Sequence, residues 1–218
     1  MAKMTTMRVL FRLLMAGAVV YPICRAATSP YAARPSEGGK TSVSLDSLSE
    51  EIMENAHIIY LAGGCFWGTQ KFFDQFDGVL GTEVGYANGN TEAPTYHEVC
   101  AGSGHAETVK IVYDPGRITL TELLEYYFMV IDPTSVNRQG NDRGIQYRTG
   151  IYYEDEALLP EIEEAYAAEE KKVGEKLAVE VLPLENYCTA EEYHQKYLDK
   201  HPFGYCHIQR KLMHLENT

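Results

Sequence analysis

Basic residues are scarce in this chain. Its 218 residues include 19 Lys and Arg against 31 Asp and Glu, which gives a formal net charge of −12 at pH 7. A protein that binds nucleic acid without sequence specificity needs a basic face. We therefore expect no nucleic-acid binding and attribute the charge to a solvated acidic surface. The hydrophobic content of 45% argues against disorder of the whole chain.

Closely spaced metal ligands are also missing. The five cysteines form no Cys-x-x-Cys or Cys-x-x-His pair, so we expect no zinc site. Internal repeats are missing too. The length allows one compact domain with a leader, or at most two small domains.

The chain has no hydrophobic run long enough to span a bilayer comfortably. The apolar stretch at residues 13–24 is too short. Residues 1–36 contain no acidic residue but five basic ones, which is typical of a secretory signal cleaved around Ala26 or Ala27. We therefore expect export to the periplasm or the extracellular space. Mitochondrial import and a retained membrane anchor, including a lipid on Cys24, are the alternatives.

Composition divides the chain into three segments. Residues 1–27 form the expected leader. Residues 28–50 are rich in Ser, Pro and Gly, which predicts a flexible linker. The expected folded domain comprises residues 51–218.

Strand and helix patterns alternate within the expected domain. Alternating or continuous apolar residues predict strands at 57–63, 82–89, 105–115, 149–155 and 177–184. Helical spacing and caps predict helices at 69–76, 119–132, 160–172 and 190–200. The mixture indicates an α/β or α+β protein with a mixed sheet.

The pentapeptide Gly-Cys-Phe-Trp-Gly at residues 64–68 is the most informative motif, and Trp67 is the only tryptophan in the chain. A strand followed by this turn would place Cys65 near a helix N-terminus, where the positive end of the dipole favours an anion. We therefore expect a lowered pKa and a reactive thiolate, with the flanking glycines leaving room for a ligand. A buried structural thiol is the alternative.

Further polar residues could serve a site around Cys65. Glu107 begins a predicted strand, although a lone glutamate there could simply be solvated. The long loop at residues 132–148 offers Asp142 and Tyr147, and Tyr96 is a further phenol. Cys206 follows Gly204 in a flexible-looking tail. This placement suits a resolving thiol or one half of a static disulfide.

Five blocks occur in one order over about 150 residues: GGCFWG, TYHEVCAGSGHAETVKIVYDP, DPTSVNRQGNDRGIQYR, AEEYHQKYL and GYC. Together they closely resemble the A-type peptide methionine sulfoxide reductases, from near His57 to Cys206. The resemblance implies an α+β fold, a two-layer sandwich with a mixed β-sheet, packed helices and a ferredoxin-like core. It also implies reduction of the S epimer of free or protein-bound methionine sulfoxide.

The resemblance implies a role for each matching residue. Cys65 would be the nucleophile, Glu107 the acid and Cys206 the resolving cysteine. Cys65 would become a sulfenic acid and then form a disulfide with Cys206, which a thioredoxin-type donor would reduce. The remaining residues would bind substrate: Phe66 and Trp67 the methyl group, and Tyr96, Asp142 and Tyr147 the sulfoxide oxygen.

The resemblance implies no bound cofactor, and we expect a monomer. Cys188 departs from the pattern, because relatives commonly have an aromatic residue there; its role stays open, and we expect Cys100 to be a small core residue. The rival functions are an exported cysteine hydrolase with His105 or His194 as base and a non-enzymatic domain stapled by a disulfide.

Overall fold

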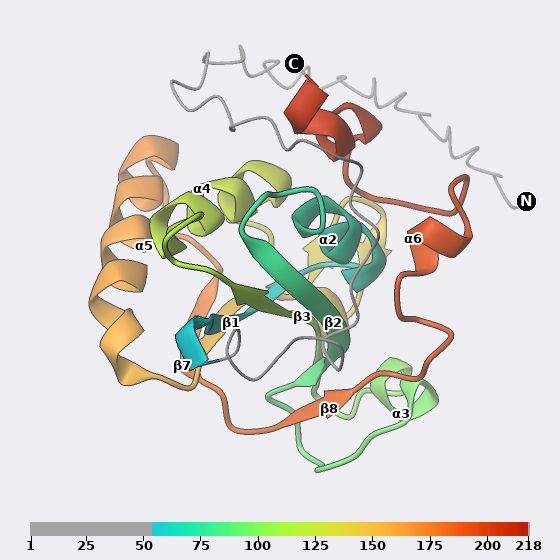
Figure 1. Ribbon diagram of the computed structural model, residues 1–218. Coiled ribbons are helices and arrows are strands. Elements are labelled where there is room, and N and C mark those ends of the chain that lie inside the picture. Colours follow the sequence, from blue (N-terminus) through green and yellow to red (C-terminus); the bar gives the residue numbers. More distant parts are fainter. Residues whose placement is uncertain (1–53, 218) are drawn as a thin grey trace, which may run out of the picture. The chain divides into compact units, whose positions relative to one another are not determined.

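The computed structural model describes residues 54–217 and contains a mixed β-sheet with packed helices (Figure 1). The expected leader, the linker and the first residues of the expected domain lie outside the described residues. Six strands form the main sheet in the order β7-β6-β1-β3-β2-β8. Every neighbouring pair is antiparallel except β6 and β7, which are parallel. The expected α+β class is confirmed.

The core of the fold consists of two consecutive strand–helix–strand units. The strand order β6-β1-β3-β2, with one helix after β1 and one after β3, is the ferredoxin-like arrangement. The six elements are β1 (His57–Gly63), α2 (Phe66–Phe73), β2 (Val79–Ala87), β3 (Ala106–Tyr113), α4 (Leu120–Val130) and β6 (Thr149–Tyr153).

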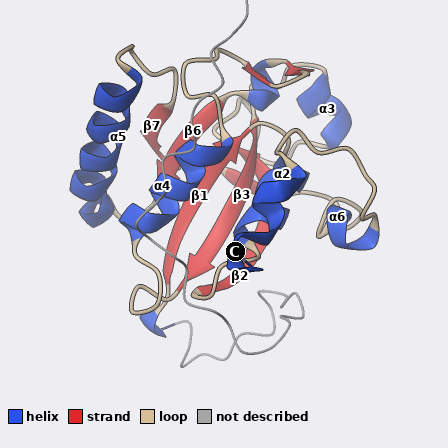
Figure 2. Ribbon diagram, turned by 90° about the horizontal axis from the view of Figure 1, so that it is seen from above, coloured by secondary structure: helices blue, strands red, loops and turns tan. Residues whose placement is uncertain are grey.

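Helices cover one face of this sheet. Successive strand residues point to opposite faces, so Ile59 and Leu61 of β1 pack in the large core under the helices, whereas Tyr60 and Ala62 pack in a smaller cluster on the other face. Figure 2 shows α2 and α4 crossing the strands, with α5 (Leu159–Val173) beside α4. The sheet and its helices therefore make the two layers that the resemblance implies.

The remaining elements extend this core at its margins. Among the described residues no helix combines the length and the apolar character that crossing a membrane requires. The short elements are α3 (Tyr96–Cys100), β4 (Arg138–Gln139), β5 (Asp142–Arg143), η2 (Ile145–Tyr147), η3 (Glu156–Leu158), β7 (Glu180–Pro183), β8 (Tyr187–Thr189), α6 (Tyr197–Lys200) and η4 (Arg210–Asn217).

The prediction of a helix at residues 190–200 is wrong. Only α6 is helical, because Lys196 adopts a left-handed conformation with φ of 51°. The side chain of Gln195 explains the interruption: its Oε1 accepts from Val84 N at 3.0 Å and its Nε2 donates to Val84 O at 2.8 Å. These tertiary hydrogen bonds to β2 outweigh the local helical pattern.

The helix expected at residues 119–132 is confirmed as α4, and its start follows the sequence signal. Thr119 is the N-cap; its Oγ1 accepts from Glu122 N, and its own N donates to Glu122 Oε2. This reciprocal pair satisfies two backbone donors that the first turn leaves without partners. The cap also fixes the point where the chain leaves β3 for the helical layer.

Candidate active site

Cys65 lies at the turn between β1 and α2. It is the N-cap residue of α2 and is 6% exposed. Gly64 has φ of +82°, a conformation that favours glycine. A methyl group there would lie 2.5 Å from Gln139 Cβ, and one at Gly68 would lie 2.9 Å from Cys206 Sγ. The expectation that these glycines leave room for a ligand is therefore wrong, because the protein's own chain uses the room.

The surroundings of Cys65 raise the pKa of its thiol well above the usual value. Burial is the largest cause, followed by the charge of Glu107. The backbone N–H groups of Trp67 and Gly68, in the first turn of α2, act in the opposite direction. The helix N-terminus thus lowers the pKa of the thiol, as expected, but burial raises that pKa by more. At neutral pH Cys65 is therefore a neutral thiol and not the expected thiolate.

Glu107 lies on the face of β3 that packs under α2, two residues before the core residue Val109. Its side chain is 2% exposed, and its Oε2 accepts a hydrogen bond from Phe66 N at 3.0 Å. Burial raises the pKa of Glu107 to about 8, although the Phe66 N–H lowers it. The carboxyl is therefore predominantly protonated at pH 7. Since Oε2 accepts, the proton resides on the other oxygen.

Two aromatic residues follow Cys65 and differ in exposure. Phe66 is 1% exposed, and its ring lies 5.9 Å from that of Tyr86 and 5.1 Å from that of His194. Trp67 is half-buried and stacks on Tyr197, with ring centroids 3.8 Å apart. Its Nε1 donates to His194 Nδ1 at 3.0 Å. These contacts fix the orientation of the indole next to Cys65.

Two phenols share the surroundings of Glu107. The pKa of Tyr96 and that of Tyr147 are both raised, first by burial and second by the charge of Glu107. The charge of Cys65 is a further cause for Tyr147. Both hydroxyls therefore stay protonated at neutral pH and can donate hydrogen bonds to a neighbouring oxygen.

Asp142 connects the long loop to the same space. Its charge contributes to the raised pKa of Cys65, Glu107 and Tyr147, and its Oδ2 accepts from Tyr205 Oη at 3.0 Å. The structure therefore brings a thiol, a protonated carboxyl, a second carboxylate and two phenols to one site.

Cys206 approaches the first turn of α2 from the C-terminal segment. Its sulfur lies against Gly68, three residues after Cys65, and its side chain is half-buried. Burial raises the pKa of Cys206, whereas the backbone N–H of Ile208 and the guanidinium of Arg210 lower it. Both Cys65 and Cys206 are free thiols here, so the structure describes the reduced pair.

The other two described cysteines differ from each other in exposure. The expectation that Cys100 is a core residue is wrong: it is exposed at the end of α3, and it contributes to the raised pKa of Tyr96. Cys188 is half-buried in the edge strand β8 and pairs across the ladder with Tyr86. No metal cluster of three or more His, Cys, Asp or Glu exists within residues 54–217.

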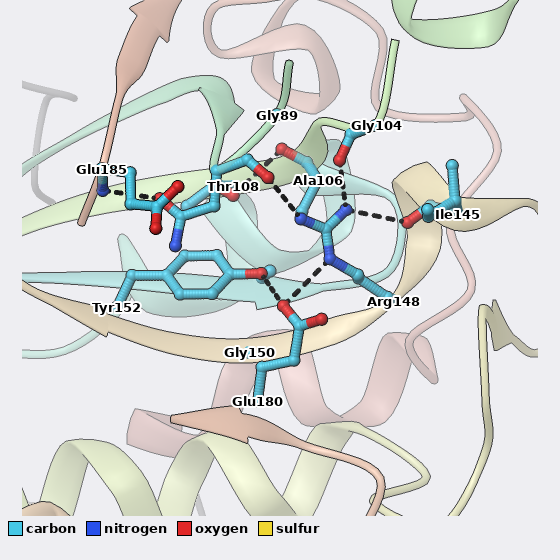
Figure 3. A network of polar contacts seen from close by, with 12 residues as sticks. Gly89, Gly104, Ala106, Thr108, Ile145, Arg148, Gly150, Tyr152, Glu180 and Glu185 are labelled. Carbon is cyan, nitrogen blue, oxygen red and sulfur yellow. Dashed lines mark hydrogen bonds and ion pairs between the residues drawn. The ribbon is translucent and has the colours of Figure 1, made fainter. Parts of the chain in front are cut away.

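A buried arginine holds the loop that carries Tyr147 (Figure 3). The Arg148 guanidinium donates to Asn88 O at 3.0 Å, Gly104 O at 3.0 Å and Ile145 O at 3.2 Å. Its Nε also pairs with Glu180 Oε2 at 3.0 Å. One side chain thus connects the ends of β2 and β3 to the long loop and to β7. This network fixes Tyr147 relative to β3.

Replacement of Arg148 by Lys should destabilise the protein by about 1–3 kcal/mol, since an ammonium cannot reach all four partners and leaves buried carbonyls without donors. Urea unfolding monitored by circular dichroism measures the change. Arg143→Lys is the matched control, because Arg143 is exposed in the same loop; it should shift stability by less than about 0.5 kcal/mol. Equal stability of the two variants would show that the network is dispensable.

Sequence reasoning missed three residues of the site as functional groups. Tyr205, which bonds to Asp142, lies in a segment expected to be a tail. Tyr197, which stacks on Trp67, lies in a segment expected to be a helix. No periodicity in the sequence indicated either contact. His194 entered only as a base for the rival hydrolase. It instead accepts from Trp67, and His105 bonds to Ser103 Oγ and Thr91 O. Neither histidine is among the charged groups that act on the Cys65 thiol, which are Glu107 and Asp142.

A family model described as peptide methionine sulfoxide reductase matches residues 57–217. The chain is 55% identical over 156 residues to peptide methionine sulfoxide reductase MsrA of Clostridium acetobutylicum, a match that covers 71% of this chain and 96% of that protein. It is 59% identical over 151 residues to the protein of the same name from Lachnoclostridium phytofermentans, covering 69% of this chain and 91% of that protein.

Solved structures show the same similarity in three dimensions. The reduced form of Mxr1 from Saccharomyces cerevisiae has a TM-score of 0.67 at 40% identity, covering 70% of this chain and 90% of that chain. Methionine sulfoxide reductase A of Corynebacterium diphtheriae has a TM-score of 0.64 at 41% identity, covering 70% and 78%.

Proposed function

Since this chain belongs to the peptide methionine sulfoxide reductases and is a peptide-methionine (S)-S-oxide reductase, we propose that Cys65 takes the oxygen from the sulfoxide while Glu107 supplies a proton to that oxygen. In the balanced step, the sulfoxide and the Cys65 thiol become methionine and a Cys65 sulfenic acid. The oxygen moves from substrate sulfur to protein sulfur, and the thiol supplies the two electrons.

Protonation of the oxygen is the central requirement. A sulfoxide sulfur is a poor electrophile until its oxygen is protonated or strongly hydrogen-bonded. The single observation that carries the proposal is the buried carboxyl of Glu107, whose pKa of about 8 keeps it protonated at neutral pH beside Cys65. As Glu107 gives up its proton, the resulting carboxylate accepts the proton of the thiol, so the pair ends the step without net proton uptake.

The high pKa of Cys65 fits this sequence of events. Burial disfavours a thiolate at Cys65, so the thiol stays protonated until substrate arrives. Charge that develops on the sulfur is then stabilised by the backbone N–H groups of Trp67 and Gly68. Transfer of the thiol proton from Cys65 to Glu107 activates the nucleophile, so no permanently ionised thiolate is required.

The remaining groups orient the substrate. The Tyr96 and Tyr147 hydroxyls donate to the sulfoxide oxygen, and Asp142 binds it through water or holds the phenols. The exposed face of Trp67, with the edge of Phe66, contacts the methyl group, which favours an apolar group over water by about 1–3 kcal/mol.

Cys206 completes the cycle in this proposal. Its thiol condenses with the Cys65 sulfenic acid, which forms a disulfide and releases water. The position of Cys206 favours this step, because its sulfur lies against Gly68, in the first turn of the helix that Cys65 caps. A thioredoxin-type dithiol then reduces the disulfide by thiol–disulfide exchange.

Thiol counting tests this assignment. The reduced enzyme is mixed with S-methionine sulfoxide without any donor, and free thiols and methionine are measured together. We expect two thiols to disappear for each methionine released, with the disulfide mapped to Cys65 and Cys206 by mass spectrometry. Methionine release without thiol loss, or a disulfide that omits either residue, would refute the proposed route.

A further inference from the structure

A cavity of about 290 Å³ lies beside Cys206, which forms part of its wall. Helix α6 and the C-terminal η4 both contact α2 (Figure 1), and residues from all three line the cavity. Leu198 and Met213 supply apolar lining and are each 8% exposed. Lys71, Asp199 and Arg210 supply charged groups. The cavity thus combines a thiol, an apolar wall and charges, and the chemistry assigned to Cys65 does not use it.

The charges in this cavity do not cancel. Lys71 Nζ lies 2.6 Å from Asp199 Oδ1, so these two neutralise each other. Arg210 pairs with no carboxylate among the described residues, and its guanidinium lies 5.9 Å from the ring centroid of Phe203. This cation–π contact orients the guanidinium without neutralising it. A ligand that reaches Cys206 through this cavity therefore meets the positive charge of Arg210, whose effect on Cys206 exceeds that of the negative charge of Asp142.

Building on the proposed function, we propose that this cavity binds a small thiol that carries carboxylates, of the glutathione class, and directs its sulfur to Cys206. The donor thiolate attacks Cys206 Sγ in the disulfide with Cys65. A donor–Cys206 disulfide forms, the bond between the two protein sulfurs breaks, and Cys65 leaves as a thiolate that takes up a proton. A second donor thiolate attacks the sulfur of the bound donor, which releases Cys206 as a thiol and the oxidised donor as its own disulfide.

The reduced arrangement of the two cysteines suits this intermediate. After the donor has attacked, no bond joins Cys65 and Cys206, and the two residues can return to the arrangement of the present structure, in which both are free. The donor attached to Cys206 then extends into the cavity. Cys65 is 6% exposed, so Cys206 is the accessible sulfur for attack. The volume of about 290 Å³ lies just below the range of small-molecule sites, which typically measure about 300–1,000 Å³. A tripeptide-sized thiol therefore suits this space and would act in addition to the thioredoxin-type dithiol.

The test compares an anionic thiol with a cationic one. The disulfide form is prepared with sulfoxide in the absence of donor and is then reduced by glutathione or by cysteamine, while the return of protein thiols is followed. Each rate is divided by the rate of the same thiol with hydroxyethyl disulfide, which corrects for intrinsic reactivity. The variants are Arg210→Glu and, as matched control, Lys211→Glu, the exposed neighbour that does not line the cavity.

We expect the wild-type rate to saturate with glutathione and to exceed the corrected cysteamine rate about tenfold. Arg210→Glu should lower the glutathione rate about tenfold and raise the cysteamine rate, whereas Lys211→Glu should change either rate less than about twofold. Rates that rise linearly without saturation and respond equally to both substitutions would overturn the proposal. So would inert glutathione with rapid reduction by a protein dithiol, which would assign this face to a protein partner. Failure of the preparatory step to release methionine and consume two thiols would instead refute the proposed function.

Discussion

Replacement of Glu107 by Gln should slow methionine release about 100- to 10,000-fold, the usual contribution of a positioned general acid. Glutamine keeps the shape of the side chain, and its carbonyl oxygen can still accept from Phe66 N, so the fold is retained. What it lacks is the proton that the buried carboxyl, with its pKa of about 8, carries at neutral pH. Rapid-quench measurement of methionine in a single turnover isolates this step.

The stability of Glu107→Gln provides an independent check. The pKa of Glu107 is higher in the folded protein than its ordinary value, so folding binds a proton at this site. The stability linked to that proton is fully present at pH values below the ordinary pKa and is lost as the pH rises to about 8. The variant should therefore be at least as stable as wild type above about pH 8. Glu92→Gln, at an exposed position, should leave both rate and stability unchanged; wild-type methionine release by Glu107→Gln would refute the acid role.

Replacement of Cys206 by Ser should abolish turnover with a thioredoxin-type donor while leaving one round of chemistry. The variant should release about one methionine per enzyme, because Cys65 can still form its sulfenic acid, and then stall without a thiol to resolve it. The change from catalytic to stoichiometric release is measured by following methionine over time with donor in excess. Intact-protein mass spectrometry should detect an added oxygen on the stalled enzyme.

Two cysteine variants serve as matched controls for Cys206→Ser. Cys188→Ser should sustain wild-type turnover, because the proposed cycle does not use Cys188. Reduced turnover would show that Cys188 exchanges with Cys206. Cys100→Ser should retain turnover, with at most a modest loss because Cys100 influences the pKa of Tyr96. Sustained turnover of Cys206→Ser itself would remove Cys206 from the cycle.

The periodic parts of the fold could be predicted from the sequence. Alternation along β3 placed Val109 and Ile111 on the core face, and the same period of two places Glu107 on that face beside α2. The cap formed by Thr119 and Glu122 marked the start of α4 correctly. These predictions from local patterns are correct because the hydrogen bonds between residues close in sequence, and the burial of one face of each element, are the same in the final fold.

The parts that failed depend on contacts distant in sequence. The pattern at residues 190–200 is helical, yet Gln195 bonds to β2 and Lys196 turns left-handed. The thiol pKa was misjudged for a similar reason, because burial and the charge of Glu107 depend on how β3 packs against α2. A helix N-terminus can be read from the sequence, but the burial that opposes it cannot.

The dependence of kcat/KM on pH tests the central claim most directly, since this parameter reports ionisations of the free enzyme. It should be measured for wild type and Glu107→Gln from about pH 6 to about pH 10, with S-methionine sulfoxide and a saturating donor. We predict that the wild-type value falls as the pH rises through about 8, where the Glu107 carboxyl loses its proton, and that the fall is absent from the variant. A wild-type value that instead climbs steadily across the range, with the same shape in Glu107→Gln, would contradict activation of the sulfoxide by this acid.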